Sequence, residues 1–153
     1  MKSAKIRSLC FYAELYVEQS PATVWSYFSD LTRWSCWSPI CLDCCLVNGA
    51  GLGPGATMRI RFQVARLPTV VLANVIGMNS PQFITWTGVK FGVSSIHTYR
   101  FESQGTGTLM INDERFFGVP YPISNAMEWW YRKTDLSLKS LQGIKRELGH
   151  RRS

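Results

Sequence analysis

One long helical pattern follows a chain that otherwise consists mainly of strand patterns. Its stripe over residues 122–148 is formed by Ile123, Met127, Trp130, Tyr131, Thr134, Leu138 and Leu141. Alternating side chains and short apolar runs predict strands over residues 6–18, 40–48, 58–62, 70–76, 83–88, 94–102 and 108–117. An apolar sheet face must be covered, and only this helix is large enough. We therefore predict an α+β fold in which a curved antiparallel sheet of about six to seven strands wraps around the long C-terminal helix.

Two short helices are expected after the first strand. Ser20 is a typical N-cap residue and Pro21 suits the first helical position, so a helix is predicted to begin there. A second short helix or turn over residues 30–39 carries Trp34 and Trp37. The chain has 153 residues with no linker and no internal repeat, so one domain over residues 1–153 is expected.

Basic residues are concentrated at the two ends of the chain, which carries a formal net charge of +7. Residues 1–9 hold three basic residues and no acidic one, and residues 128–153 hold seven basic and three acidic residues. A DNA-binding domain usually carries its charge as a stripe on the folded body, so DNA is not expected as a partner. Residues 1–8 and 149–153 are instead expected to be solvated basic tails that allow weak contact with an anionic membrane surface or RNA.

The chain shows no pattern for export or membrane insertion. Glu14 interrupts the only early apolar run, and no cleavage site follows it. The uncharged stretch 67–89 contains Pro68, Gly77 and Pro81, which indicates two strands around a turn rather than a membrane helix. A cytoplasmic protein with reduced cysteines is expected.

Four of the five cysteines lie within residues 36–45. Structural zinc usually requires two close pairs of ligands, and no second pair is present. If residues 40–48 form a regular strand, Cys41 and Cys45 share one face while Cys44 points to the other. We expect no metal site and interpret the cysteines as small buried apolar residues rather than ligands or nucleophiles.

Several motifs occur in the order and spacing of a known superfamily. They are Ser20-Pro-Ala-Thr-Val-Trp25, Asp30 with Trp34 and Trp37-Ser-Pro39, Gly53-Pro-Gly55, Ile84-Thr-Trp-Thr-Gly88, His97-Thr-Tyr-Arg-Phe101, Gly107-Thr108, Glu114-Arg-Phe-Phe-Gly118 and Leu138-Lys139. Over residues 9–148 the chain resembles the START-like, helix-grip (Bet v 1-like, SRPBCC) superfamily, and within it the polyketide cyclase/dehydrase branch. The resemblance implies one hydrophobic-ligand-binding domain, a Gly-rich loop (49–55) at the cavity entrance, and no required cofactor.

The last two predicted strands form a hairpin whose register follows from its turn at residues 104–107. If Ser103 faces Thr108, the next facing pairs are Phe101 with Met110, Tyr99 with Asn112 and His97 with Glu114. Their side chains then share one face, and the apolar pair indicates that it is the inner face. An imidazole and a carboxylate would meet inside an apolar cavity, where such a pair can transfer protons near neutral pH.

The candidate site combines these polar groups with apolar walls. His97, Glu114 and Tyr99 are the candidate catalytic residues, and Asn112 is a candidate ligand-binding residue. Alternatively, His97 and Glu114 only satisfy each other as a buried pair. The candidate ligand contacts are Ile84, Trp86, Phe101, Met110, Phe116, Met127, Trp130 and Tyr131, with Trp34 and Trp37 at the cavity mouth. Core packing is the alternative interpretation of each ring.

Two classes of function stay open at this point. The resemblance implies that cyclases of this fold hold substrate carbonyls with Arg and Tyr side chains in the pocket. Strand alternation instead places Arg59, Arg61, Arg100 and Arg115 on the outer face. One hypothesis is an enzyme that cyclises or dehydrates a polyketide-like or aromatic molecule. The other is a non-catalytic carrier or sensor of a lipid, quinone or similar ligand.

Overall fold

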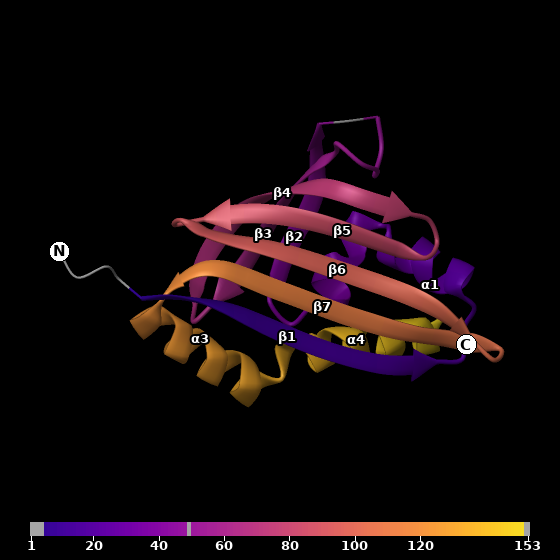
Figure 1. The fold of residues 1–153 in the computed structure, drawn as a ribbon. Coiled ribbons are helices and arrows are strands. Elements are labelled where there is room, and N and C mark those ends of the chain that lie inside the picture. The colour runs from indigo at the N-terminus through magenta and orange to yellow at the C-terminus, as the bar shows by residue number, and fades with distance from the viewer. Residues whose placement is uncertain (1–4, 49, 152–153) are drawn as a thin grey trace.

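The computed structural model describes residues 5–48 and 50–151. Its elements in chain order are β1 (Ile6–Val17), α1 (Pro21–Phe28), the 3-10 helix η1 (Leu31–Arg33), α2 (Trp34–Trp37), β2 (Cys41–Asn48), β3 (Thr57–Val64), β4 (Leu67–Asn79), β5 (Phe83–Lys90), β6 (Val93–Gln104), β7 (Gly107–Pro120), α3 (Tyr121–Thr134) and α4 (Leu136–His150) (Figure 1).

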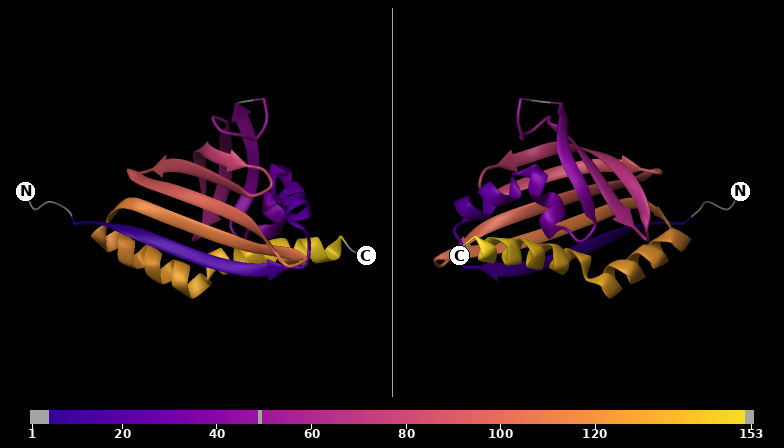
Figure 2. Two further views of the ribbon diagram at one scale, coloured as in Figure 1. Left: turned by 45° about the vertical axis from the view of Figure 1, so that its right-hand side comes forward. Right: turned by 180° about the vertical axis from the view of Figure 1, so that it is seen from behind.

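The strands form one antiparallel sheet in the order β1-β7-β6-β5-β4-β3-β2. Strands β2 to β6 each pair with the next strand in the chain, and β1 pairs with β7, with Ile6 facing Pro120. The sheet curves, and the short helices and α4 lie within its concave side (Figure 2). The predicted α+β helix-grip fold is confirmed, with seven strands in the described chain.

The register predicted for the β6–β7 hairpin is also confirmed. Glu114 faces His97, Asn112 faces Tyr99, and Thr108 faces Ser103. Phe101 and Met110 face each other and are almost completely buried, at 1% and 0% exposure. The shared face of these residues is therefore the inner face of the sheet.

Local capping explains why two short helices follow β1. The Ser20 hydroxyl accepts a hydrogen bond of 3.3 Å from the Thr23 backbone N–H and so caps α1. The Asp30 carboxylate accepts one of 3.2 Å from the Thr32 N–H and caps η1. The chain then turns Trp34 inward, where its indole N–H donates to the Phe28 carbonyl oxygen at 2.8 Å. The expected pair of short helices is present.

The C-terminal helical region is divided in two, whereas the sequence predicts one helix over 122–148. Asp135 adopts a left-handed conformation, with φ 50° and ψ 44°, and separates α3 from α4. Asp tolerates this conformation better than most residues. The break changes the direction of the chain: α4 buries Leu141, Ile144 and Leu148, whereas Ser124 is the one fully buried residue of α3. The α4 half therefore forms the helical core of the grip, and α3 extends along β1 and β7.

Parts of the predicted basic tails belong to regular secondary structure. Residues 6–8 belong to β1, and Arg7 forms an ion pair of 3.0 Å with Glu128. Helix α4 continues to His150, so residues 149 and 150 are helical. The prediction was wrong here because pairing with β7 and packing of α4 satisfy these backbone groups. Residues 1–4 and 152–153, the remainder of the predicted tails, lie outside the described residues.

The cysteines do not follow the predicted alternation. Cys41 and Cys44 are buried, whereas Cys45 is exposed. A bulge between Cys41 and Asp43 shifts the register with β3 and reverses the alternation beyond it. Only two of the cysteines are therefore small core residues, since Cys10 and Cys36 are exposed as well. Within residues 5–48 and 50–151, no three His, Cys, Asp or Glu side chains group in a way that could hold a metal ion.

Thiol modification should distinguish these two sets of cysteines. Burial raises the pKa of the Cys41 thiol to about 11, and it raises the pKa of Cys44 further. The thiolate is the reactive form, so neither should react with iodoacetamide near neutral pH. Mass spectrometry should find the label on Cys10, Cys36 and Cys45 in the native protein, and on every cysteine in urea. Rapid native labelling of Cys41 would contradict the burial described here.

No helix in the described part of the chain is both long enough and apolar enough to cross a membrane.

Candidate functional site

A cavity of about 420 Å³ lies between the inner face of the sheet and the helices. Its walls are mostly apolar, with side chains from β2 to β7 and from α2, α3 and α4. Ser38, Lys90 and Ser95 are separate polar residues of the wall. One larger polar cluster is formed by His97, Tyr99, Asn112, Glu114, Tyr131, Ser137 and Ser140. The hydrogen bonds within this cluster determine what the cavity can do chemically.

His97 and Glu114 lie side by side on β6 and β7. The His97 Nδ1 atom is 3.4 Å from the Glu114 Oε1 atom, and the two side chains are 15% and 16% exposed. The Tyr131 hydroxyl on α3 donates to the other carboxylate oxygen at 3.2 Å. Tyr131 is held for this contact by stacking on Phe11, with ring centroids 4.0 Å apart. Three elements of the fold therefore orient the Glu114 carboxylate.

The orientation of the Asn112 amide determines which nitrogen of His97 carries hydrogen. The Asn112 Nδ2 group lies 3.3 Å from the Ser137 carbonyl oxygen, which can only accept, and also donates to the Tyr99 hydroxyl at 3.1 Å. The Asn112 Oδ1 atom must therefore face His97, at 2.6 Å from Nε2. Since an amide oxygen only accepts, His97 Nε2 is the donor in this contact.

This assignment leaves Nδ1 of His97 to interact with Glu114. An unprotonated Nδ1 would present its lone pair to a carboxylate oxygen, which is unfavourable. The contact becomes favourable when one proton lies between Nδ1 and Oε1, on either the imidazole or the carboxyl group. The pair, which we call the dyad (His97 and Glu114), is thus arranged to hold and exchange one proton beside the cavity.

The two tyrosines of the cluster are neutral hydrogen-bonding groups. Burial raises the pKa of Tyr99 far above its ordinary value, and the Glu114 carboxylate raises it further. The pKa of Tyr131 is raised in the same way by burial and by Glu114. Because the raised pKa keeps Tyr99 protonated, this side chain can form hydrogen bonds but cannot act as a base. Within the cluster, the dyad is therefore the group that can transfer protons.

Most of the predicted wall residues line the cavity. They are Trp34, Trp37, Trp86, Phe116, Met127, Trp130 and Tyr131. Trp34 and Trp37 were predicted at the mouth, but they lie deep in the wall at 3% and 4% exposure. The reason is that both indoles of α2 pack inward: Trp34 donates to the Phe28 carbonyl oxygen and contacts Trp86, with centroids 5.4 Å apart.

Three predicted ligand contacts are core residues. Ile84, Phe101 and Met110 share the inner face with the site but pack into the core cluster and are not part of the cavity wall. Phe101 packs on Phe28 of α1, with centroids 5.1 Å apart. Alternation assigns a residue to a face but does not show which part of that face a helix covers. The described part of the Gly-rich loop, residues 50–55, also lies outside the wall, although it was expected at the entrance.

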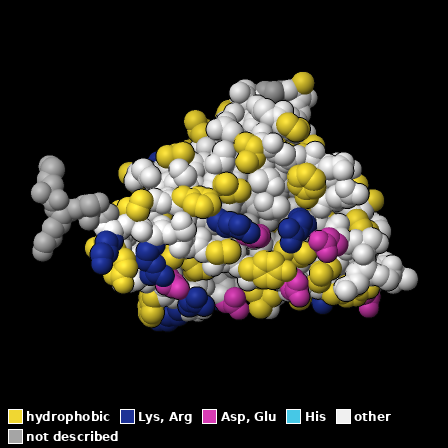
Figure 3. Space-filling model, in the orientation of Figure 1, with side chains coloured by type: hydrophobic (Ala, Val, Ile, Leu, Met, Phe, Trp, Pro, Cys, Tyr) yellow, Lys and Arg dark blue, Asp and Glu magenta, His cyan; other side chains and the backbone are white. Residues whose placement is uncertain are grey.

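Arginine is absent from the described cavity wall, as strand alternation predicts. Arg59 and Arg61 lie beside Asp43 on the outer face. Arg115 pairs with Asp113, and Arg100 lies 3.6 Å from Glu102. Basic side chains are visible on this outer face in Figure 3.

Sequence reasoning missed two groups of wall residues. The first is the apolar series on β3 and β4, including Ile60, Phe62, Val64 and Val71. Its alternation was visible in the sequence and could have identified it. The second is Ser137 and Ser140 near the start of α4, whose position depends on the helix break at Asp135. Nothing in the local sequence predicts that placement.

A curved sheet closed by α4 over an apolar cavity defines a helix-grip ligand-binding domain. The chain belongs to the family described as "Polyketide cyclase / dehydrase and lipid transport", which matches residues 9–148. The class therefore binds hydrophobic molecules and includes both catalytic and non-catalytic members.

Solved structures with the same fold include both enzymes and other proteins. The ZhuI aromatase/cyclase from Streptomyces sp. R1128 has a TM-score of 0.80 at 13% identity, covering 96% of this chain and 97% of that one. Norcoclaurine synthase from Thalictrum flavum has a TM-score of 0.73 at 13% identity, covering 99% and 100%. Ginseng major latex-like protein 151 from Panax ginseng has a TM-score of 0.70 at 11% identity, covering 92% and 97%. No curated protein sequence matches this chain.

Proposed function

We propose that this protein encloses a polyketide-like or aromatic small molecule and promotes its cyclisation or dehydration by acid–base chemistry. The observation that supports this most strongly is the dyad, which lines a mostly apolar cavity and can share one proton. A ligand that only needed an apolar container would not require it. The similarity to an aromatase/cyclase fold is consistent with this reaction class.

The proposed chemistry needs only groups of this chain. The cavity holds a flexible substrate in a folded conformation and excludes water. The deprotonated form of the dyad takes a proton from carbon beside a carbonyl group and returns it to a departing hydroxyl, which leaves as water. In this proposal the Tyr99 hydroxyl donates a hydrogen bond to the carbonyl oxygen. Asn112 acts as a positioning residue, because its amide is already committed to His97, Tyr99 and Ser137.

The test begins with the molecule that the protein carries. Native mass spectrometry of protein purified from its source should show an aromatic or polyketide-like ligand of defined mass. Incubation of apoprotein with the precursor class should then yield a product lighter by one water or a cyclised isomer, measured by liquid chromatography and mass spectrometry. Recovery of the same molecule unchanged after prolonged incubation would contradict catalysis.

A second candidate function is a non-catalytic carrier of a lipid, quinone or similar molecule. The absence of arginine from the described wall favours it, since the one Lys or Arg side chain there is the exposed Lys90, away from the polar cluster. In that case the dyad would hydrogen-bond one polar group of the ligand. Release of an unchanged quinone or lipid on denaturation would support the carrier function.

A further inference from the structure

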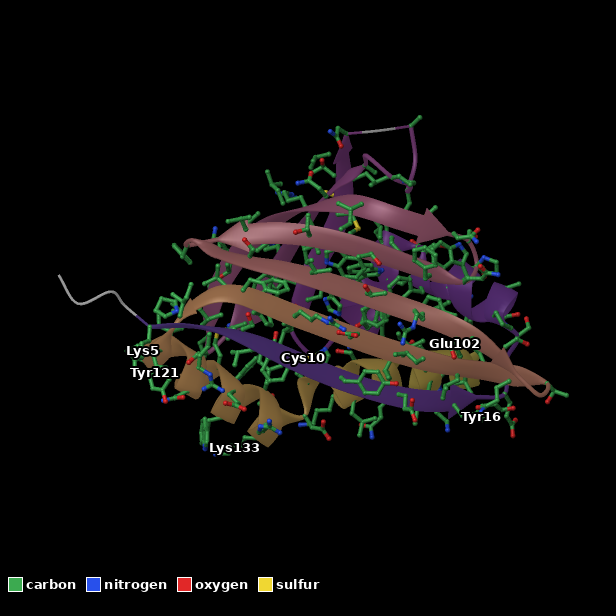
Figure 4. All side chains as sticks on the ribbon, viewed as in Figure 1. Lys5, Cys10, Tyr16, Glu102, Tyr121 and Lys133 are labelled. Carbon is green, nitrogen blue, oxygen red and sulfur yellow. The ribbon has the colours of Figure 1, made fainter. Side chains whose placement is uncertain are left out.

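The exposed residues of the cavity wall, which include Lys90, Phe91 and Ile123, mark where the cavity meets solvent, at one end of the strands. In this antiparallel sheet β3, β5 and β7 run in the same direction, so the C-terminal ends of all three lie at the same end of the sheet. The β3–β4 turn, the β5–β6 turn and the start of α3 therefore lie together there. Val64, Val93 and Pro120 from these segments line the cavity, as does the exposed Phe91. The same end carries Lys5 and Tyr121 (Figure 4).

Four separate segments contribute exposed apolar side chains to this end of the sheet. Phe91 is 91% exposed, Leu67 69%, Ile6 67% and Ile123 51%. Scattered exposed apolar residues are ordinary on a protein surface. These four differ because β1, β4, the β5–β6 turn and α3 bring them to the one end where the cavity opens. We call them, with Lys5, Arg66 and Lys90, the rim.

The turns at the rim contain residues that the backbone disfavours. Phe91 has φ 51°, Arg66 has φ 66° and Ala65 has φ 50°. Two-residue hairpin turns of this kind favour Asn and Gly, because a side chain destabilises the left-handed conformation. The conformational stability of these turns therefore does not explain why Phe91 and Arg66 occupy them. A contact between these side chains and another molecule would explain it.

The charge at the rim has one sign. Residues 62–101 contain no Asp or Glu, and neither do residues 115–127, so both hairpin turns and the start of α3 lack acidic side chains. Lys5, Arg66 and Lys90 are exposed there. Apolar side chains next to cations suit the surface of an anionic bilayer. The apolar side chains can enter the boundary between headgroups and acyl chains, and the cations can bind the anionic headgroups.

We infer that the rim docks the open end of the cavity onto an anionic lipid membrane. An apolar ligand can then pass between bilayer and cavity without exposing its surface to water. The inference rests on the cavity taking an apolar ligand, as proposed above, and holds whether that ligand is converted or only carried. It assigns membrane contact to structured segments, Ile6 of β1 among them, whereas the sequence suggested solvated tails at both ends of the chain.

Co-sedimentation with vesicles tests the inference with the intact chain. The wild type should bind vesicles of phosphatidylcholine with phosphatidylserine, bind pure phosphatidylcholine more weakly, and dissociate as salt is raised. Phe91→Ser should reduce binding by at least about tenfold, since a large apolar side chain no longer enters the bilayer. Leu67→Ser and Arg66→Glu should each reduce it by about fivefold or more.

Matched variants away from the rim separate docking from general surface change. Leu72→Ser removes a leucine of β4 that is 54% exposed and lies outside the rim, and Lys139→Glu reverses an exposed charge on α4. Both should bind vesicles as the wild type does. Wild type that stays in the supernatant with anionic vesicles, or equal losses in rim and control variants, would overturn the inference.

A ligand measurement keeps this result distinct from the proposed function. Leu67 and Arg66 do not line the cavity, so Leu67→Ser and Arg66→Glu should still quench tryptophan fluorescence with 1-naphthol as the wild type does. Normal quenching with lost vesicle binding supports the rim. Quenching absent from the wild type would count against the cavity function, while the vesicle result would still decide whether the rim docks.

Discussion

Replacing His97 with alanine is expected to lower the rate of ligand conversion by about a hundredfold or more, because a positioned acid–base group contributes about that much. Glu114→Gln should have a similar effect. The glutamine keeps the shape of the side chain and can donate to Nδ1, but it cannot exchange the shared proton. Conversion of the ligand found by native mass spectrometry would be followed in single-turnover experiments.

The controls for this prediction lie elsewhere in the same chain. His150→Ala changes the other histidine of the chain, and Glu102→Gln changes an exposed carboxylate of β6. Both should retain the wild-type rate, and circular dichroism should show that all four variants remain folded. Full conversion by both dyad variants would remove the catalytic role and leave the buried-pair interpretation.

Replacing Gly143 with alanine is expected to lower the free energy of unfolding by about 3 kcal/mol, the upper part of the usual range for overpacking. A Cβ atom at this position would overlap the Trp37 carbonyl oxygen and lie 2.8 Å from the carbonyl carbon. These are backbone atoms of α2 and cannot move aside as a flexible side chain can. Helix α4 would have to shift away from α2, and the wall that holds Trp37 would shift with it.

Gly149→Ala is the matched control, because Gly149 belongs to the same helix and a methyl group there would have no described atom outside its own helical turn within 4 Å. Alanine is the better helix former, so this variant should be unchanged or more stable by up to about 1 kcal/mol. Urea unfolding followed by fluorescence would measure both variants. Equal stability of the two would mean that α4 does not approach α2 as closely as described.

The hairpin shows how far local sequence determines the site. A four-residue turn, with alternation on both sides, was sufficient to pair His97 with Glu114 and Tyr99 with Asn112. That reasoning worked because both strands are contiguous and have no bulge between these pairs. It failed on β2, where the bulge after Cys41 reverses the alternation and buries Cys44. A bulge adds one residue to one strand, and no turn signal in the sequence marks it.

The break at Asp135 is the second feature that local patterns could not predict. It divides the C-terminal region so that α3 presents Tyr131 to Glu114 while α4 presents the Ser137 carbonyl to Asn112. A continuous helix would not bring both groups to the cluster in this way. The protonation pattern of His97 therefore depends on a contact between residues 25 positions apart in the chain, Asn112 and Ser137.

By itself, the sequence determined the order of the strands, the pairing within the hairpin and the face on which its side chains lie. These follow from period, turn chemistry and capping, which act over a few residues. Only the tertiary structure decided which inner-face residues pack and which line the cavity, how Asn112 is oriented, and where the cavity opens. Those properties depend on how distant segments meet, because a helix must cover part of the inner face before the uncovered part becomes a cavity.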